Sequence, residues 1–440
     1  MTGVRIGLRT ALPFVALLAF AVRVAYVLAN RHTPVLGDAL MYHLQGANLA
    51  DGQGWHRVYE PAMPTAEFPP MHIIMVAAAD LLGLHGTQDQ KLFFAAVGTI
   101  TVVLVALLAR AVTRSDRVGV IAGLLAATYP MLWLPDGALM GETTYGVLLT
   151  GALLAAVGLV RTPTPARAAL TGGLLGLAAL SRGEAIGLLV LLVVPLAWRA
   201  APAWRARLAL VAAAFAAFAL VLAPWEARLL TTFDKPVLIS DNSSGIWVGA
   251  NCPDTYYGDL IGSWKFQCYG TDRIGGDESV RFAEYRRRGL EYLGDHAGRL
   301  PVVVAARLGR VLDVYRPWGQ GAFLASAEGR HVRAQRLGLL AYWLLVPWAI
   351  AGAVLLWRRR ERALLVLLAP VALVLLVAAT TYGSTRFRFA AEPGLVVLGA
   401  VTVDAVLGSL LRARRRPDSA TATSDSAGIS QSQSMEAWKA

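Results

Sequence analysis

The chain has 440 residues, of which 56% are hydrophobic and only 16% charged, and its mean hydropathy is +0.52. Soluble domains are about a quarter charged and roughly half apolar, so this composition excludes an ordinary soluble protein and indicates a polytopic membrane protein. The net charge of +12 comes largely from arginine clusters at the ends of apolar segments, a pattern typical of membrane topology. We therefore expect membrane lipids, and no nucleic acid, among its partners.

Apolar runs of about 17–25 residues predict membrane-spanning helices. We expect an all-α fold with about ten of them, at 9–30, 91–111, 118–135, 143–160, 168–181, 184–198, 207–224, 336–357, 362–380 and 391–411. The first run is too long for a secretory signal and lacks a small-residue cleavage site, so it is expected to remain as the first helix. The segment 69–84, opened by Pro-Pro, is either a short span or an interfacial helix.

The distribution of arginine decides between these two topologies. If 69–84 lies on the membrane, the arginine-rich connections at 110–117, 161–167, 199–207, 358–362 and 412–416 all fall on one side. The short connections on the other side then carry a single arginine, Arg182. This positive-inside pattern predicts a multi-pass membrane protein with both termini cytoplasmic.

This topology divides the chain into four parts. We expect an N-terminal transmembrane module at 1–224 that contains a first outer loop at 31–90, an outer region at 225–335, further transmembrane helices at 336–411, and a disordered cytoplasmic tail at 412–440. Apolar spacing within 278–297 predicts an amphipathic interfacial helix. Cys252 and Cys268 both fall in the outer region, where they are either two free thiols or, as we expect in an oxidising compartment, a disulfide.

Ionisable residues gather near the outer ends of the expected helices. They are Asp38, Glu67, His72, Asp136, Glu142, Arg182, Glu184, Arg386, Arg388 and Glu392. Each taken alone could be a loop or snorkelling residue in contact with water. Charged residues at membrane depth are nevertheless costly, and their shared side favours one outward-facing cavity with a function.

The residue types indicate which chemistry such a cavity could support. Asp38 suits a general base toward a hydroxyl group, although capping of a turn in its Gly-rich loop is the alternative. Arg182, Arg386 and Arg388 suit phosphate, because guanidinium stays charged and binds oxyanions through two donors. Glu142 and His72 could add a divalent cation, but no dense group of ligands supports a metal. A Walker loop is absent from the sequence, which argues against an ATP-driven pump.

Six segments resemble, in order, the C-type integral membrane glycosyltransferases, in particular the bacterial branch related to protein O-mannosyltransferases and lipid A aminoarabinose transferases. They are "GDALMYHLQGANLADGQGW", "PTAEFPPMHIIMVAAADLLG", "LAATYPMLWLPDGALMGETTYGVLL", "GGLLGLAALSRGEAIGLLVL", "APWEARLLTTFDKPVLISDNSSGIWVGANCP" and "YGSTRFRFAAEPGLVVLGA". The resemblance covers roughly 10–411. It departs from the family in the first loop, where Asp38 is followed by Ala39 instead of a second acid.

The resemblance implies a glycosyltransferase of the bacterial inner (plasma) membrane with its active site on the periplasmic or outer face. It moves a sugar from a polyprenyl-phosphate donor to a glycan, lipid or protein acceptor, with inversion at the anomeric carbon. It implies Asp38 and Glu142 as catalytic residues, and Arg182, Arg386 and Arg388 as ligands of the donor phosphate. Tyr42, His43, His72 and Glu184 are expected to line the substrate cavity. The alternatives are a carrier or flippase for lipid-linked glycans and a non-catalytic partner in envelope assembly.

Overall fold

The computed structural model describes residues 7–60, 63–272 and 274–413. Within these ranges the regular elements are helices, and the only β-pairing is an isolated bridge between His56 and Pro64. The prediction of an all-α fold is therefore confirmed. The last part of the expected cytoplasmic tail, 414–440, lies outside the described residues.

Helices form at all ten of the expected spans. Seven segments are long and apolar enough to cross a membrane: α1 (Leu8–Ala29), α4 (Thr87–Thr113), α7 (Glu142–Arg161), Gly183–Ala200, which ends in α9 (Val194–Ala200), α10 (Trp204–Thr232), α16 (Val332–Arg358) and α19 (Glu392–Ala413). The other three are shorter: α5 (Asp116–Thr128), α8 (Pro165–Ala179) and α17 (Leu364–Thr380). Apolar length thus predicts each helix, and the chain is a multi-pass membrane protein.

One expected span, 118–135, is shorter than predicted. Its helix α5 ends at Thr128, and Tyr129 is extended with φ −75° and ψ 114°. The cause is Pro130, because a residue that precedes proline is disfavoured in helical conformation. The chain continues through a short 3₁₀ turn at Pro130–Leu132 and through α6 (Leu134–Gly137) before α7 begins.

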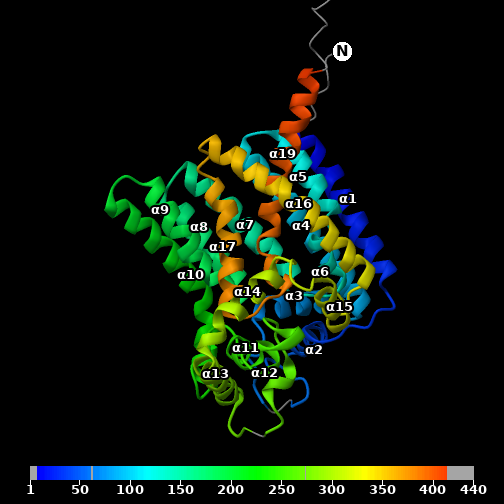
Figure 1. Ribbon diagram of the computed structural model, residues 1–440, viewed down its shortest axis with the longest axis vertical. Coiled ribbons are helices and arrows are strands. Elements are labelled where there is room, and N and C mark those ends of the chain that lie inside the picture. Colours follow the sequence, from blue (N-terminus) through cyan, green and yellow to red (C-terminus); the bar gives the residue numbers. More distant parts are fainter. Residues whose placement is uncertain (1–6, 61–62, 273, 414–440) are drawn as a thin grey trace, which may run out of the picture.

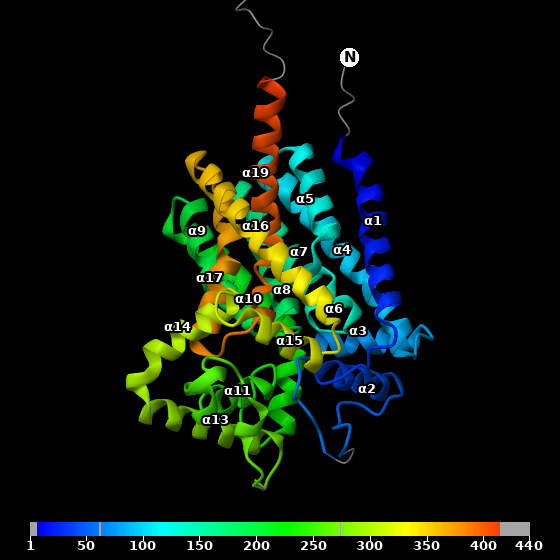
Figure 2. The same cartoon turned by 45° about the vertical axis from the view of Figure 1, so that its right-hand side comes forward.

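The remaining helices gather at one end of the bundle. Figure 1 shows that α11 (Asn242–Ala250), α12 (Pro253–Tyr256) and α13 (Glu278–Asp295), here called the cap, lie opposite the end at which α1 begins and α19 ends. Figure 2 shows α3 (Pro70–Leu81), α14 (Leu300–Val311) and α15 (Pro317–Ala327) between the cap and the spans, whereas α2 (Asp38–Ala50) lies beside the cap, at the level of α11. The α13 helix is the amphipathic helix expected at 278–297. At about 1.5 Å per residue, α3 is too short to cross the hydrocarbon core unaided.

A buried ion pair joins α1 to the irregular segment before α7. Arg23 of α1 donates through Nε to Asp136 Oδ2 at 2.7 Å, and both side chains are almost fully buried. Thr143 donates to the other carboxylate oxygen of Asp136 at 2.7 Å. Asp136 was expected in the outward-facing cavity, but the structure places it inside the helix packing, where its charge is balanced by Arg23.

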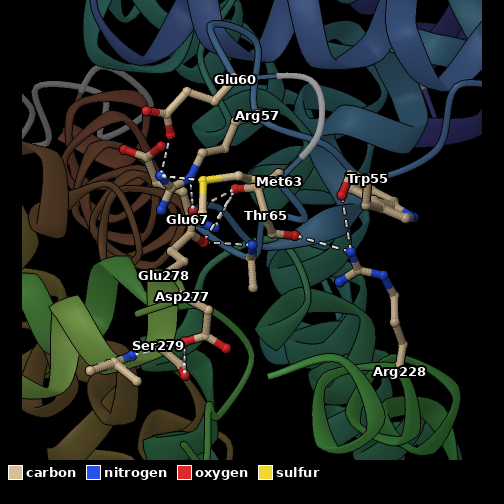
Figure 3. Close-up of polar contacts among 12 residues, drawn as sticks. Trp55, Arg57, Glu60, Met63, Thr65, Glu67, Arg228, Asp277, Glu278 and Ser279 are labelled. Carbon is tan, nitrogen blue, oxygen red and sulfur yellow. Dashed lines mark hydrogen bonds and ion pairs between the residues drawn. The ribbon is translucent and has the colours of Figure 1, made fainter. Parts of the chain in front are cut away.

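Glu278 at the start of α13 holds the first outer loop against the cap (Figure 3). Its buried carboxylate accepts hydrogen bonds from Arg57 Nε at 2.9 Å, Ala66 N at 2.7 Å and Thr65 Oγ1 at 3.1 Å. Arg228 of α10 holds the same loop from the other side, because its guanidinium donates to the carbonyls of Trp55 and Thr65. These contacts fix the loop that carries Asp38 relative to both the spans and the cap.

Candidate active site

Asp38 is the first residue of α2 and is held there by a required glycine. The preceding residue, Gly37, has φ +57°, and a Cβ at this position would lie 2.8 Å from the carbonyl oxygen of Ala327. The N-cap residue of α2 is Gly37, which has no side chain that could cap the helix. The Asp38 carboxylate accepts a hydrogen bond through Oδ2 from Arg386 Nη1 at 2.8 Å, and the side chain remains 32% exposed. The capping alternative therefore does not describe this residue.

Glu142 contacts two arginines, one of which also contacts Asp38. It is the first residue of α7, where the helix dipole favours a negative charge. Its Oε1 accepts hydrogen bonds at 2.8 Å from both Arg386 Nε and Arg182 Nη1. Glu184 completes the arrangement by accepting from Arg182 Nε at 2.6 Å. Predicted site residues from four segments that are far apart in the sequence thus contact one another.

Glu328 and Arg330 also belong to this site, and the sequence analysis missed them. Glu328 follows α15, lies 3.3 Å from Arg386 Nε through Oε1, and forms an ion pair of 2.6 Å with Arg330. The turn between them needs a glycine, because Gly329 has φ +65° and a Cβ there would lie 2.3 Å from Pro34 O. We call the seven residues together the Arg386 cluster. They are Asp38, Glu142, Arg182, Glu184, Glu328, Arg330 and Arg386.

The charges of the Arg386 cluster are strongly coupled. Burial alone would lower the pKa of Arg386, but Glu142, Glu328 and Asp38 raise that pKa well above its ordinary value. Burial raises the pKa of Glu328, although Arg330 and Arg386 oppose this shift. Arg386 is therefore always positively charged, and it contacts the partly exposed carboxylate of Asp38. A small pocket lined in part by Glu142, Arg330 and Arg386 borders the cluster.

The other predicted cavity residues lie beside the Arg386 cluster rather than in it. Tyr42 is buried, and its ring packs edge-on against Phe68 and His72. His43 turns toward α4, where its Nδ1 lies 2.9 Å from Gln90 Oε1. These contacts give Tyr42 and His43 the role of supporting α2, on which Asp38 lies.

The Glu142 and His72 pair does not fit a divalent cation. Both ring nitrogens of His72 already have protein partners, Thr144 Oγ1 at 2.8 Å and Leu139 O at 3.3 Å. The charge of Glu142 is balanced by two arginines rather than by a metal. Among the residues that the structure describes, no three His, Cys, Asp or Glu side chains are placed to hold a metal ion.

Arg388 lies in a second, fully buried cluster. It donates to Asp313 Oδ2 at 2.6 Å and to Glu392 Oε1 at 2.7 Å, and its guanidinium lies 3.5 Å from the centre of the Tyr342 ring. Tyr129 donates to the other oxygen of Glu392 at 2.7 Å. We call these five residues the Arg388 cluster. The structure therefore places Arg388 in a cluster of its own, whereas Glu392 contacts Arg388 and also lines the small pocket beside the Arg386 cluster.

The disulfide and the remaining predicted acid lie in the outer part of the molecule. The structure joins Cys252 and Cys268, the two cysteines for which a disulfide was expected. Glu67 is part of the first outer loop, and its carbonyl accepts a hydrogen bond from Asn242 N at 3.2 Å, at the start of α11. The neighbouring Asp241 N donates to Ala66 O at 2.8 Å.

The carboxyl groups of Glu67 and Asp241 are expected to make the stability of the protein depend on pH. Burial, with help from Glu278, raises the pKa of Glu67 to about 7 and that of Asp241 to about 8, from ordinary values of 4.5 and 3.8. The folded chain therefore retains protons that the unfolded chain releases, so this contribution is complete below the ordinary values and is lost as the pH rises through 7 and 8. We expect the Tm in detergent to fall as the pH rises from about 4 to about 8 and to level off above about pH 8.

Asp241→Asn should flatten this fall in Tm, because the amide has no proton to lose. Asp295→Asn, at the exposed end of α13, is the matched control and should leave the profile unchanged. A Tm that rises over the same pH interval would contradict the assignment.

Comparison with known proteins identifies the fold. No protein-family model and no curated protein matches the sequence. The structure is similar to the oligosaccharyltransferase of Archaeoglobus fulgidus, solved in complex with Zn and sulfate, with 18% identity and a TM-score of 0.55 over 91% of this chain and 49% of that chain. The same enzyme tethered to an acceptor peptide gives 17% identity and a TM-score of 0.53, over 92% of this chain and 50% of that chain. This chain thus spans about half the length of that enzyme.

A second protein, ArnT from Cupriavidus metallidurans bound to undecaprenyl phosphate, aligns over 92% of this chain and 79% of its own, with 16% identity and a TM-score of 0.36. The chain therefore shares the polytopic helical fold of the archaeal oligosaccharyltransferase.

Proposed function

We propose that the protein is a glycosyltransferase of the bacterial inner membrane that moves a sugar from a polyprenyl-phosphate donor to an acceptor of the cell envelope. The reaction takes place on the periplasmic face and inverts the anomeric carbon. The observation that carries the proposal is the contact of Asp38 with Arg386 at 2.8 Å, above the arginine pair that Glu142 holds. A base toward a hydroxyl and a binding site for phosphate are thereby adjacent.

In the proposed reaction, Asp38 and Arg386 have different roles. The acceptor oxygen attacks the anomeric carbon, the bond between that carbon and the phosphate oxygen breaks, and the polyprenyl phosphate leaves with the bonding electrons. The proton of the acceptor hydroxyl passes to the Asp38 carboxylate. Arg386 and Arg182 stabilise the negative charge that develops on the phosphate, because their guanidinium groups are fixed before the substrate arrives.

The accessibility of the residues supports this division of roles. Asp38 is the most exposed carboxylate of the Arg386 cluster, whereas Glu142 and Glu328 are almost completely buried. Among the described residues, its Oδ1 takes part in no hydrogen bond. Glu142 and Glu328 therefore position the arginines, and Asp38 is the acid that an acceptor can reach. The arginine distribution assigns the cap end of the bundle to the outer face, and this assignment supports a reaction on that face.

Substitution of Arg386 tests the proposal directly. In lipid nanodiscs with polyprenyl-phosphate sugars extracted from the source organism, we expect the purified chain to release polyprenyl phosphate as sugar is transferred to envelope extract. Arg386→Gln should lower the rate of transfer by about 10²–10³, the usual loss for a fixed electrostatic donor. Glu142 keeps Arg182 as a partner in this variant, so folding should survive.

Arg286→Gln, on the exposed side of α13, is the matched control and should transfer sugar at the rate of the unaltered chain. Transfer by Arg386→Gln at that same rate, with equal yields and Tm, would refute the proposal.

A further inference from the structure

The Arg386 cluster contains more acids than arginines. Its seven residues have four carboxyl groups and three guanidinium groups. The adjoining Arg388 cluster likewise has two acids, Asp313 and Glu392, for one arginine. With every acid ionised, the site would repel the anionic donor that the proposed function requires, because charges in a partly buried site interact strongly. The loss of one negative charge from the site would therefore favour the binding of a phosphate.

Glu328 is the acid that Arg386 holds least firmly. Its Oε1 lies 3.3 Å from Arg386 Nε. Glu142 and Asp38, by contrast, each accept a hydrogen bond from Arg386 at 2.8 Å. Glu328 Oε2 forms an ion pair of 2.6 Å with Arg330, but the geometry of this contact is not that of a hydrogen bond, and Oε2 has no other hydrogen-bond partner among the described residues. Because the Glu328 side chain is only 5% exposed, its carboxylate is poorly satisfied.

The surroundings of Glu328 favour its neutral form. Burial raises its pKa from the ordinary value, whereas Arg330 and Arg386 lower it. Glu142 and Asp38, the other charged groups that act on Glu328, raise this pKa by repulsion. An anion that took Arg386 as its partner would weaken one of the two opposing cations and would add a further negative charge nearby. Both changes would raise the pKa of Glu328 again, so this carboxylate would take up a proton.

Glu328 can become neutral without leaving its place. It lies in the turn after α15, which is held against the first outer loop, while Arg386 belongs to α18 (Thr385–Arg388). The carbonyl oxygen of a protonated carboxyl group can still accept from Arg330. Arg386 would then be free to bind an oxyanion while the turn keeps its position.

We propose that Glu328 is the exchangeable counter-ion of Arg386. In the free site, the Glu328 carboxylate balances the charge of Arg386. When the phosphate of the donor binds Arg386, Glu328 takes up one proton from the solvent, and the phosphate replaces it as the partner of the guanidinium group. Glu328 is thus a positioning residue that acts on the donor through Arg386. This inference rests on the proposed function and adds that donor binding is linked to pH.

Proton uptake on binding of a non-titrating anion tests the inference. The full chain in lipid nanodiscs is titrated with farnesyl methyl phosphate, a phosphodiester whose single charge is constant near neutral pH, with no acceptor present. Calorimetry in two buffers of different ionisation enthalpy counts the protons taken up. We expect about one proton per bound anion, and a Kd that rises up to about tenfold per pH unit between about pH 6 and about pH 9. No proton uptake anywhere in this interval would overturn the inference.

Substitution of Glu328 should strengthen binding, which the loss of a merely structural contact would not do. The amide of Glu328→Gln has the size of the carboxylate but no charge. This variant should bind farnesyl methyl phosphate about tenfold more tightly at about pH 8, take up no proton and lose the pH dependence. Glu328→Asp, which keeps the acid, should keep the proton uptake. Glu291→Gln, at an exposed position of α13, is the matched control and should behave as the unaltered chain.

Three outcomes would contradict the inference. Weaker binding by Glu328→Gln with an unchanged proton count would leave Glu328 a structural role only. Uptake that is lost in Asp38→Asn but kept in Glu328→Gln would make Asp38 the counter-ion. Binding that stops with EDTA and takes up no proton would assign the balancing charge to a divalent cation.

The experiment also separates this inference from the proposed function. Because no acceptor is present and no transfer is measured, a chain that transfers no sugar can still show the proton uptake. A chain that transfers sugar but binds the anion without a proton would keep the proposed function and refute the role of Glu328.

Discussion

Replacement of Asp38 by asparagine is expected to lower kcat for sugar transfer by about 10²–10⁴, the usual contribution of one general base. The amide has the size of the carboxylate, and its oxygen can still accept the hydrogen bond from Arg386. The variant should therefore fold, bind donor with a nearly unchanged KM, and fail in the chemical step. The measurement is the initial rate of polyprenyl phosphate release at saturating donor and acceptor.

The control for this experiment is Asp51→Asn, because Asp51 is an exposed acid at the other end of α2. Asp51→Asn should release polyprenyl phosphate at the rate of the unaltered chain. If Asp38→Asn matched that rate, Asp38 would have no part in proton transfer. If its KM rose while kcat stayed constant, Asp38 would be a binding residue instead.

Arg388→Met is expected to prevent stable folding rather than to weaken donor binding. The substitution leaves the carboxylates of Asp313 and Glu392 buried without the cation that both contact. Removal of one partner from a buried ion pair costs about 3–5 kcal/mol, a large part of the stability of a typical domain. We expect a much lower yield of monodisperse protein and a lower Tm, measured by size-exclusion chromatography and thermal unfolding in detergent.

Arg358→Met, at the exposed end of α16, should leave both the yield and the Tm unchanged. The combined variant Arg388→Met, Asp313→Asn, Glu392→Gln should recover part of the loss, because it removes the uncompensated charges as well. If Arg388→Met had a normal Tm but bound the donor more weakly, Arg388 would be a ligand of the donor phosphate.

The two arginines show what a sequence can predict at such a site. Arg386 and Arg388 were grouped because both are basic and both precede the last helix. They lie two positions apart in α18, however, and residues with that spacing face different sides of a helix. One side chain therefore points to Asp38 and Glu142, and the other points into the Arg388 cluster. Helical spacing alone could have separated them.

The fold itself was largely accessible from the sequence, because apolar length is a strong requirement of the bilayer. The helices α1, α4 and α19 begin and end within a few residues of the expected positions. The early end of α5 was also accessible, through Pro130. Glu328 and Arg330 were not, because they lie in a connection with no periodic pattern, and their place depends on the seating of Gly329 on Pro34.

The contact between Asp38 and Arg386 joins residues 348 positions apart, and this separation orders events during synthesis. At about 5–20 residues per second, a ribosome needs roughly 17–70 s after Asp38 to reach Arg386. During that interval Glu142, Glu184 and Glu328 are added in turn, and the arginine that contacts Asp38 is added last. Insertion of the segment that carries Arg386 is thus the step that completes the Arg386 cluster. A chain that stops earlier would contain the cap but would lack the arginine on which the proposed reaction depends.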